Sequence, residues 1–165
     1  MVVAARNALD EINAHSHAKE AIAMLDCHLG NREYVAPPNP NLMSGCARLK
    51  LKEVLQALRG ESGSKVCDRY VYQCFDWLFY YLDRIGYLLA QGFIQTDDVA
   101  DPLAPYVSVL RDNENDFEPI LRIHCYSSVS SLLAAIAERK KTSPTGSVCD
   151  KAVRFAASLI SRRNA

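Results

Sequence analysis

The feature that most constrains the fold is a long helical pattern at residues 65–91 whose apolar side chains cover a wide arc. At about 100° per residue, the positions that follow Val71 on this arc are Cys74, Phe75, Leu78, Phe79, Leu82, Ile85, Gly86 and Leu89. Tyr70, Trp77, Tyr81 and Leu88 widen it to about twice the stripe of roughly 100° that an ordinary surface helix carries. A helix with so wide an apolar arc contacts several neighbours, so we expect it at the centre of a bundle.

Gly86 is unusual within this helix, because glycine lowers helix propensity by about 1 kcal/mol relative to alanine. A side chain consisting of a single hydrogen lets another backbone come very close. We therefore expect a second helix to cross the central helix at Gly86.

Apolar periodicity predicts five further helices, at residues 3–27, 42–59, 97–111, 117–141 and 148–163. Polar residues around His15 interrupt the apolar stripe of the first of these helices, which predicts either a bend or an exposed waist there. Asp101-Pro102 has the pattern of a second helix start. Three prolines at residues 37–40 predict a stiff connector, and residues 112–116 an acidic loop. The sequence thus predicts an all-α, single-domain bundle of about six helices.

Length and composition agree with this fold class. A chain of 165 residues, 49% of them hydrophobic, can bury a sizeable core. It has no run of eighteen apolar residues and no cationic-then-apolar segment near its start, so we expect no membrane partner and a cytoplasmic location. The six cysteines form no Cys-x-x-Cys pair, which favours reduced thiols.

The charges are unevenly distributed, although the net charge is zero. Residues 65–118 hold 4 basic and 10 acidic side chains, whereas residues 119–165 hold 8 basic and 2 acidic ones. The candidate anion-binding residues are Arg139, Lys140, Lys141, Lys151, Arg154 and Arg162. They support an alternative hypothesis of a nucleic-acid-associated protein, although a pI near 6.9 is more typical of a solvated basic face.

The polar stripe of the central helix is the preferred candidate site. Its residues, spaced so that they share one side of the helix, are Arg69, Asp76, Tyr80, Asp83, Arg84 and Tyr87. Tyrosine and arginine are enriched among residues that dominate protein interfaces, which favours a partner-binding surface. The same spacing is also typical of a solvated face, or of a polar network against a neighbouring helix.

Catalytic and metal-binding patterns are missing from the sequence. His15 and His17 would diverge by about 200° on a helix, so they cannot share a metal as an i, i+4 pair would. There is no Gly-x-Ser-x-Gly motif and no cysteine-enzyme signature. We therefore predict no metal, no cofactor and no catalytic residue. Two alternatives stay open: an enzyme site assembled from distant residues, and a metal site assembled from cysteine and histidine across helices.

One segment resembles a known family. Leu82-Asp-Arg-Ile-Gly-Tyr-Leu-Leu-Ala-Gln-Gly-Phe-Ile94, followed by Asp97, Asp98 and Val99, resembles the core of an uncharacterised family of helical bacterial proteins. Some members are described as associated with phage defence, and many carry a membrane helix that this sequence lacks. The resemblance implies a helical fold and a bacterial or phage setting, and it carries over no chemistry.

These observations favour a non-enzymatic interaction or regulatory module. We expect a protein partner, and self-association as a homo-oligomer, because apolar surface in excess of one core often forms an interface between copies.

Overall fold

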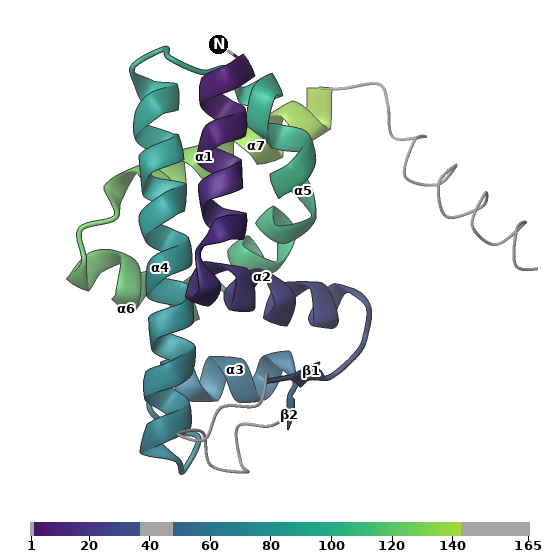
Figure 1. Cartoon of the computed structure of the whole chain (residues 1–165), viewed down its shortest axis with the longest axis vertical. Coiled ribbons are helices and arrows are strands. Elements are labelled where there is room, and N and C mark those ends of the chain that lie inside the picture. The colour runs from purple at the N-terminus through teal and green to yellow at the C-terminus, as the bar shows by residue number, and fades with distance from the viewer. Residues whose placement is uncertain (1, 37–47, 143–165) are drawn as a thin grey trace, which may run out of the picture.

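The computed structural model describes residues 2–36 and 48–142, which form seven helices and one short pair of strands (Figure 1). The helices are α1 (Val2–Ala14), α2 (Ser16–Leu29), α3 (Leu51–Leu58), α4 (Lys65–Ala90), α5 (Thr96–Asp112), α6 (Glu114–Ile123) and α7 (Ser127–Thr142). Between α2 and α3, β1 (Tyr34–Val35) pairs antiparallel with β2 (Arg48–Leu49). The predicted all-α bundle is confirmed.

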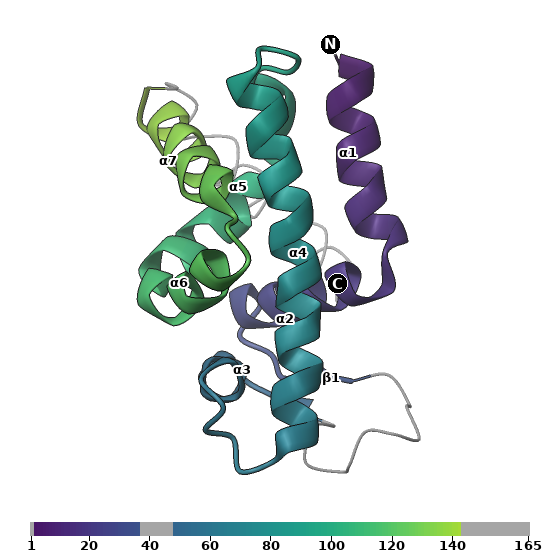
Figure 2. The same cartoon turned by 90° about the vertical axis from the view of Figure 1, so that its left-hand side faces the viewer.

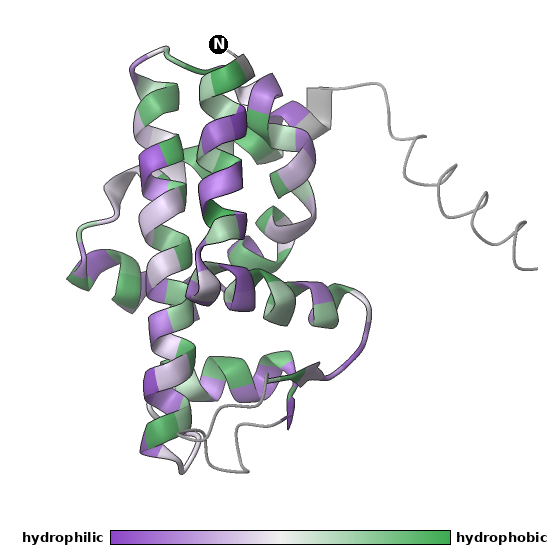
Figure 3. Cartoon of the chain, in the orientation of Figure 1, coloured by the Kyte–Doolittle hydropathy of each residue, from purple (hydrophilic) through white to green (hydrophobic). Residues whose placement is uncertain are grey.

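Helix α4 lies at the centre of the bundle, as its wide apolar arc predicts. It packs against α1, α2, α3 and α7, and Figure 2 shows α1 on one side of it with α6 and α7 on the other. Its start is fixed by Ser64, whose side chain accepts a hydrogen bond from the backbone N–H of Cys67. Nine of its residues are buried, among them Phe75, Leu78 and Phe79. Polar and apolar residues alternate along it in Figure 3, as expected for a helix with one remaining polar side.

The close approach expected at Gly86 is confirmed. A Cβ atom added to Gly86 would lie 2.6 Å from the backbone oxygen of Ser128 and 2.8 Å from its Cβ. Glycine is therefore needed here because the first turn of α7 crosses the α4 backbone at this position.

The single helix predicted at residues 3–27 is wrong, because the chain breaks at His15. This residue is extended, with φ −84° and ψ 119°, and its ring nitrogen Nδ1 accepts from the backbone N–H of Ala18 at 3.4 Å. His15 thus takes the N-cap position of α2, where a side-chain acceptor satisfies a backbone donor that the helix leaves unpaired. Two helices at an angle replace one, and both pack on α4.

The helix predicted at residues 117–141 is also broken. The acidic loop predicted at residues 112–116 is reduced to a turn at Asn113 between α5 and α6. Helix α6 begins at Glu114, where the carboxylates of Glu114 and Asp116 lie in the first turn and interact favourably with the helix dipole. The chain then turns at Cys125, whose φ of 57° is left-handed, before α7 starts at Ser127. Residues 124–126 thus form a corner between two helices, although the apolar periodicity of the sequence continues across it.

The remaining boundaries differ less. Helix α5 runs one residue beyond the predicted 97–111 at each end, and Asp101-Pro102 lies inside it rather than at a second cap. The predicted helix 42–59 is observed as α3, and residues 48–49 form a strand instead. Residues 42–47 and the predicted helix 148–163 lie outside the described residues. No helix within residues 2–36 and 48–142 has both the length and the apolar character that crossing a bilayer requires.

Candidate interaction surface on the central helix

The predicted polar stripe of α4 divides into two sides with different surroundings. Asp76 bonds to Tyr126 in the corner between α6 and α7, and Asp83 bonds to Ser128 in the first turn of α7. Tyr80, Arg84 and Tyr87 are exposed, and Arg84 reaches α1. Arg69, near the start of α4, is exposed as well. Four of the six predicted residues are therefore exposed, and the other two, Asp76 and Asp83, form hydrogen bonds within the domain.

Asp76 belongs to a polar cluster with Tyr72 of α4 and with His124 and Tyr126 of the corner between α6 and α7. Its Oδ1 accepts a hydrogen bond from the Tyr126 hydroxyl at 2.8 Å and lies 3.6 Å from Nε2 of His124. The Tyr72 hydroxyl is 2.9 Å from the same histidine nitrogen, and the His124 and Tyr126 rings stack with centroids 5.5 Å apart. Burial raises the pKa of the Tyr126 phenol, and its bond to Asp76 raises it further. This phenol therefore acts as a hydrogen-bond donor, not as a base.

Asp83 holds the start of α7. Its carboxylate accepts a hydrogen bond from the backbone N–H of Ser128 at 2.8 Å. That N–H is one of the donors that a helix start leaves unpaired, and a negative charge there also interacts favourably with the helix dipole. Asp83 and Gly86 thus fix the same crossing of α7 over α4, one by a hydrogen bond and the other by lack of a side chain.

The exposed side of α4 carries large aromatic residues at successive turns. Trp77, Tyr80 and Tyr87 have 39%, 40% and 56% of their surface exposed. Arg84 lies among them, with its guanidinium carbon 6.0 Å from the centre of the Tyr80 ring and an ion pair to Glu11 of α1. We call Trp77, Tyr80, Arg84 and Tyr87 the aromatic stripe.

Contacts with His15, which lies between α1 and α2, hold part of the stripe in place. The His15 ring lies 4.1 Å from the Trp77 ring and 5.7 Å from that of Tyr81, while Tyr80 meets both Trp77 and Tyr81 edge-on. The sequence did not predict that Trp77 is exposed, nor that His15 caps α2 and packs on the Trp77 ring. It placed Trp77 on the buried arc and His15 within a helix, and only the break at His15 shows otherwise.

The break at His15 also changes the position of His15 relative to His17, which the sequence placed on one continuous helix. His15 precedes α2 and His17 lies in its first turn, so their rings approach to 6.0 Å instead of diverging on one helix. No group of three or more histidine, cysteine, aspartate or glutamate side chains in the described part of the chain is placed to bind a metal ion.

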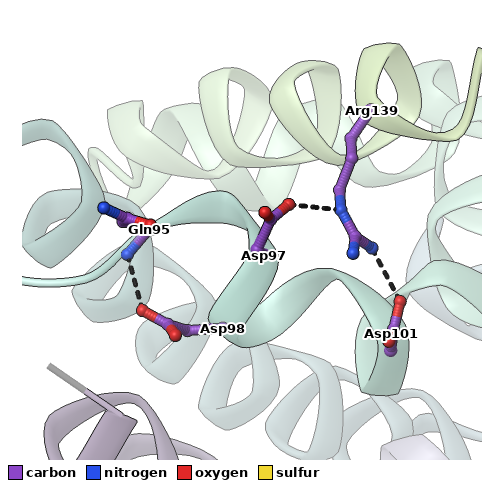
Figure 4. A network of polar contacts seen from close by, with 5 residues as sticks. All are labelled: Gln95, Asp97, Asp98, Asp101 and Arg139. Carbon is purple, nitrogen blue, oxygen red and sulfur yellow. Dashed lines mark hydrogen bonds and ion pairs between the residues drawn. The ribbon is translucent and has the colours of Figure 1, made fainter. Parts of the chain in front are cut away.

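The second predicted site is only partly described. Arg139 bonds to Asp97 through Nε at 2.5 Å and to Asp101 through a terminal nitrogen at 2.6 Å, joining α7 to the start of α5 (Figure 4). Both partners come from the acidic middle of the sequence, so here the basic and acidic parts neutralise each other. Lys140 and Lys141 belong to the last turn of α7. Lys151, Arg154 and Arg162 lie outside the described residues.

The described cysteines offer no reactive pair. Cys27, Cys67, Cys74 and Cys125 are free thiols, and burial raises the pKa of Cys74 to about 12. A thiol with so high a pKa stays protonated near neutral pH and acts as a small apolar side chain. Cys125 is exposed beside a hollow of about 440 Å³ between α6 and α7, which neither Asp76 nor His124 lines.

Comparison of the chain with protein-family models, with curated proteins and with solved structures finds no match. The case for a function therefore depends on the geometry of these surfaces.

Proposed function

We propose that this protein is a non-enzymatic interaction module that binds a protein partner through the aromatic stripe of α4. The observation that supports this most directly is the exposure of Trp77, Tyr80 and Tyr87 on the helix that otherwise forms the centre of the core. Water contact with three such side chains is unfavourable in an isolated domain, and aromatic residues beside an arginine are typical of interface hot spots.

The stripe is also held rigid before binding, which lowers the entropy cost of association. Trp77 is packed between His15 and Tyr80, and Arg84 is held by Glu11 and the Tyr80 ring. A second copy of the chain is one candidate partner, and a cytoplasmic bacterial or phage setting belongs to the same proposal.

The test compares two double variants of the full chain. Tyr80→Ala with Tyr87→Ala removes two exposed aromatic groups from the stripe, and we expect a loss of affinity of at least about tenfold. Leu29→Ala with Ile123→Ala is the matched control, because these side chains are similarly exposed but lie elsewhere, in α2 and α6.

Binding is measured in two ways. Sedimentation velocity follows self-association, and a photo-crosslinking amino acid at Tyr87, with Lys52 as the control position, captures other partners in cells. Circular dichroism checks that both double variants remain helical. The stripe is not the binding surface if the two double variants bind equally well, or if capture from position 52 matches capture from position 87.

A further inference from the structure

The strongest unexplained surface feature is a groove between α5 and α7. It has a volume of about 410 Å³ and a floor of small or aliphatic side chains, with Ala104 and Val107 from α5 and Ile136 and Ala137 from α7. Its polar lining is Ser108, Arg111, Asp112 and Glu114. Neither acidic residue forms an ion pair with any residue of the described ranges 2–36 and 48–142. This groove is apart from the aromatic stripe and takes no part in the proposed function.

The chain that follows α7 has the right pattern to occupy this groove. Residues 143–165 lie outside the described residues, but the sequence predicts a helix at 148–163. Its apolar side carries Cys149, Ala152, Val153, Ala156 and Ile160, and its opposite side carries Lys151, Arg154, Ser158 and Arg162. Such a helix has one apolar face, which needs a surface to cover it.

The connection is long enough for this segment to return to its own domain. Ile136 lies six residues before the last residue of α7, a distance of about 9 Å along the helix axis. The five residues 143–147 can span roughly 16–18 Å, and they include Pro144 and Gly146, which favour a reversal of the chain. A helix of sixteen residues, about 24 Å long, would then run back over both Ala137 and Ala104.

The charges also favour this arrangement. Residues 143–165 hold four basic residues and one acidic residue, while the rest of the chain holds fifteen basic and eighteen acidic ones. The segment is therefore attracted to the body that precedes it. We propose that residues 148–163 bind the α5–α7 groove of their own chain through the apolar side, leaving Lys151, Arg154 and Arg162 toward solvent.

Thiol crosslinking in the full chain tests the contact directly, because Cys149 lies on the apolar side of the predicted helix. With Ala104→Cys in the groove, dibromobimane is expected to join the two thiols within one molecule, as identified by mass spectrometry of the linked peptides. Ser16→Cys, at an exposed position of α2, is the matched control, and Cys149→Ser should abolish the link. Equal linking at position 16, or linking only between two molecules, would overturn the proposal.

Hydrogen exchange gives a second readout that needs no crosslink. Val153→Asp puts a charge on the apolar side of the segment, and Ser158→Asp puts the same charge on the opposite side. We expect Val153→Asp to speed exchange of the amides at residues 104–112 about tenfold, as loss of one buried aliphatic contact predicts. Ser158→Asp should leave them unchanged. Identical exchange in the two variants would contradict docking, and a dependence on protein concentration would assign the groove to a second copy.

Discussion

His15 shows how one side chain can set both a helix boundary and a surface. Its Nδ1 accepts the N–H of Ala18 at the start of α2, and its ring lies against Trp77. The first role requires an unprotonated Nδ1, because a protonated imidazole has no acceptor. Burial, and then the charge of His17, lower the pKa of His15 below its ordinary value of 6.5.

Acid should therefore destabilise the fold through His15. The unfolded chain takes up this proton near pH 6.5 and the folded chain only at lower pH, so the contribution of His15 is complete above pH 6.5 and is lost as the pH falls below it. Trp77 is the one tryptophan in the sequence, so its fluorescence in the native protein should titrate with a midpoint below 6.5.

His15→Asn is the control for this titration, because asparagine keeps a side-chain acceptor and does not titrate. Its Trp77 fluorescence should stay constant between pH 7.5 and 5.5, and its free energy of unfolding should fall less over that range than that of the wild type. A wild-type midpoint above 6.5 would contradict the assignment.

Among the helices, periodicity predicted α4 closely, gave only a bend or an exposed waist near His15, and missed the break at Cys125. The wide apolar arc after Val71 corresponds to the contacts that α4 makes with several neighbouring helices. The width of this arc alone was therefore enough to predict the extent and central position of α4. The breaks at His15 and Cys125 depend on a side-chain cap and on one left-handed residue. Apolar periodicity resumes after each of these local features, so the pattern alone does not show that one helix ends there and another begins.

The crossing of α7 over α4 yields a prediction about packing. Gly86→Ala should destabilise the protein although alanine favours helix by about 1 kcal/mol, because the new Cβ would lie 2.6 Å from a backbone oxygen that cannot rotate away. Overpacking of this kind typically costs about 1–3 kcal/mol, which exceeds the gain in propensity. Urea unfolding would measure the change, with the exposed neighbour Tyr87→Ala as control. A more stable Gly86→Ala variant would mean that α7 shifts freely at this crossing.

Over the whole molecule, the sequence predicted which residues share a side of α4 but not what each of them contacts. Helical spacing placed Tyr80, Arg84 and Tyr87 on one side of α4, and the structure keeps them exposed. The same spacing placed Asp76 and Asp83 with them, but these carboxylates bond to Tyr126 and Ser128. Spacing within one helix describes which residues share a side, whereas the partner across that side depends on packing between distant segments.

The arrangement of the bundle also predicts how the molecule opens. Residues 71–86 of α4 pack against α1, α2, α3 and α7 on all but their exposed side, so we expect their amides to exchange only when the entire domain unfolds. Helix α1 contacts neighbours along one side and exposes Val3, Ala4, Arg6 and Asn7, so its first turns should open locally at much lower free energy.

Native-state hydrogen exchange under increasing urea distinguishes global unfolding from this local opening. The free energy of exchange in α4 should equal the global free energy of unfolding and fall with the full urea dependence, while that of residues 3–9 should be lower and nearly independent of urea. If the α4 amides exchange as readily as those of α1, the central helix is not the part of the molecule on which the other helices depend.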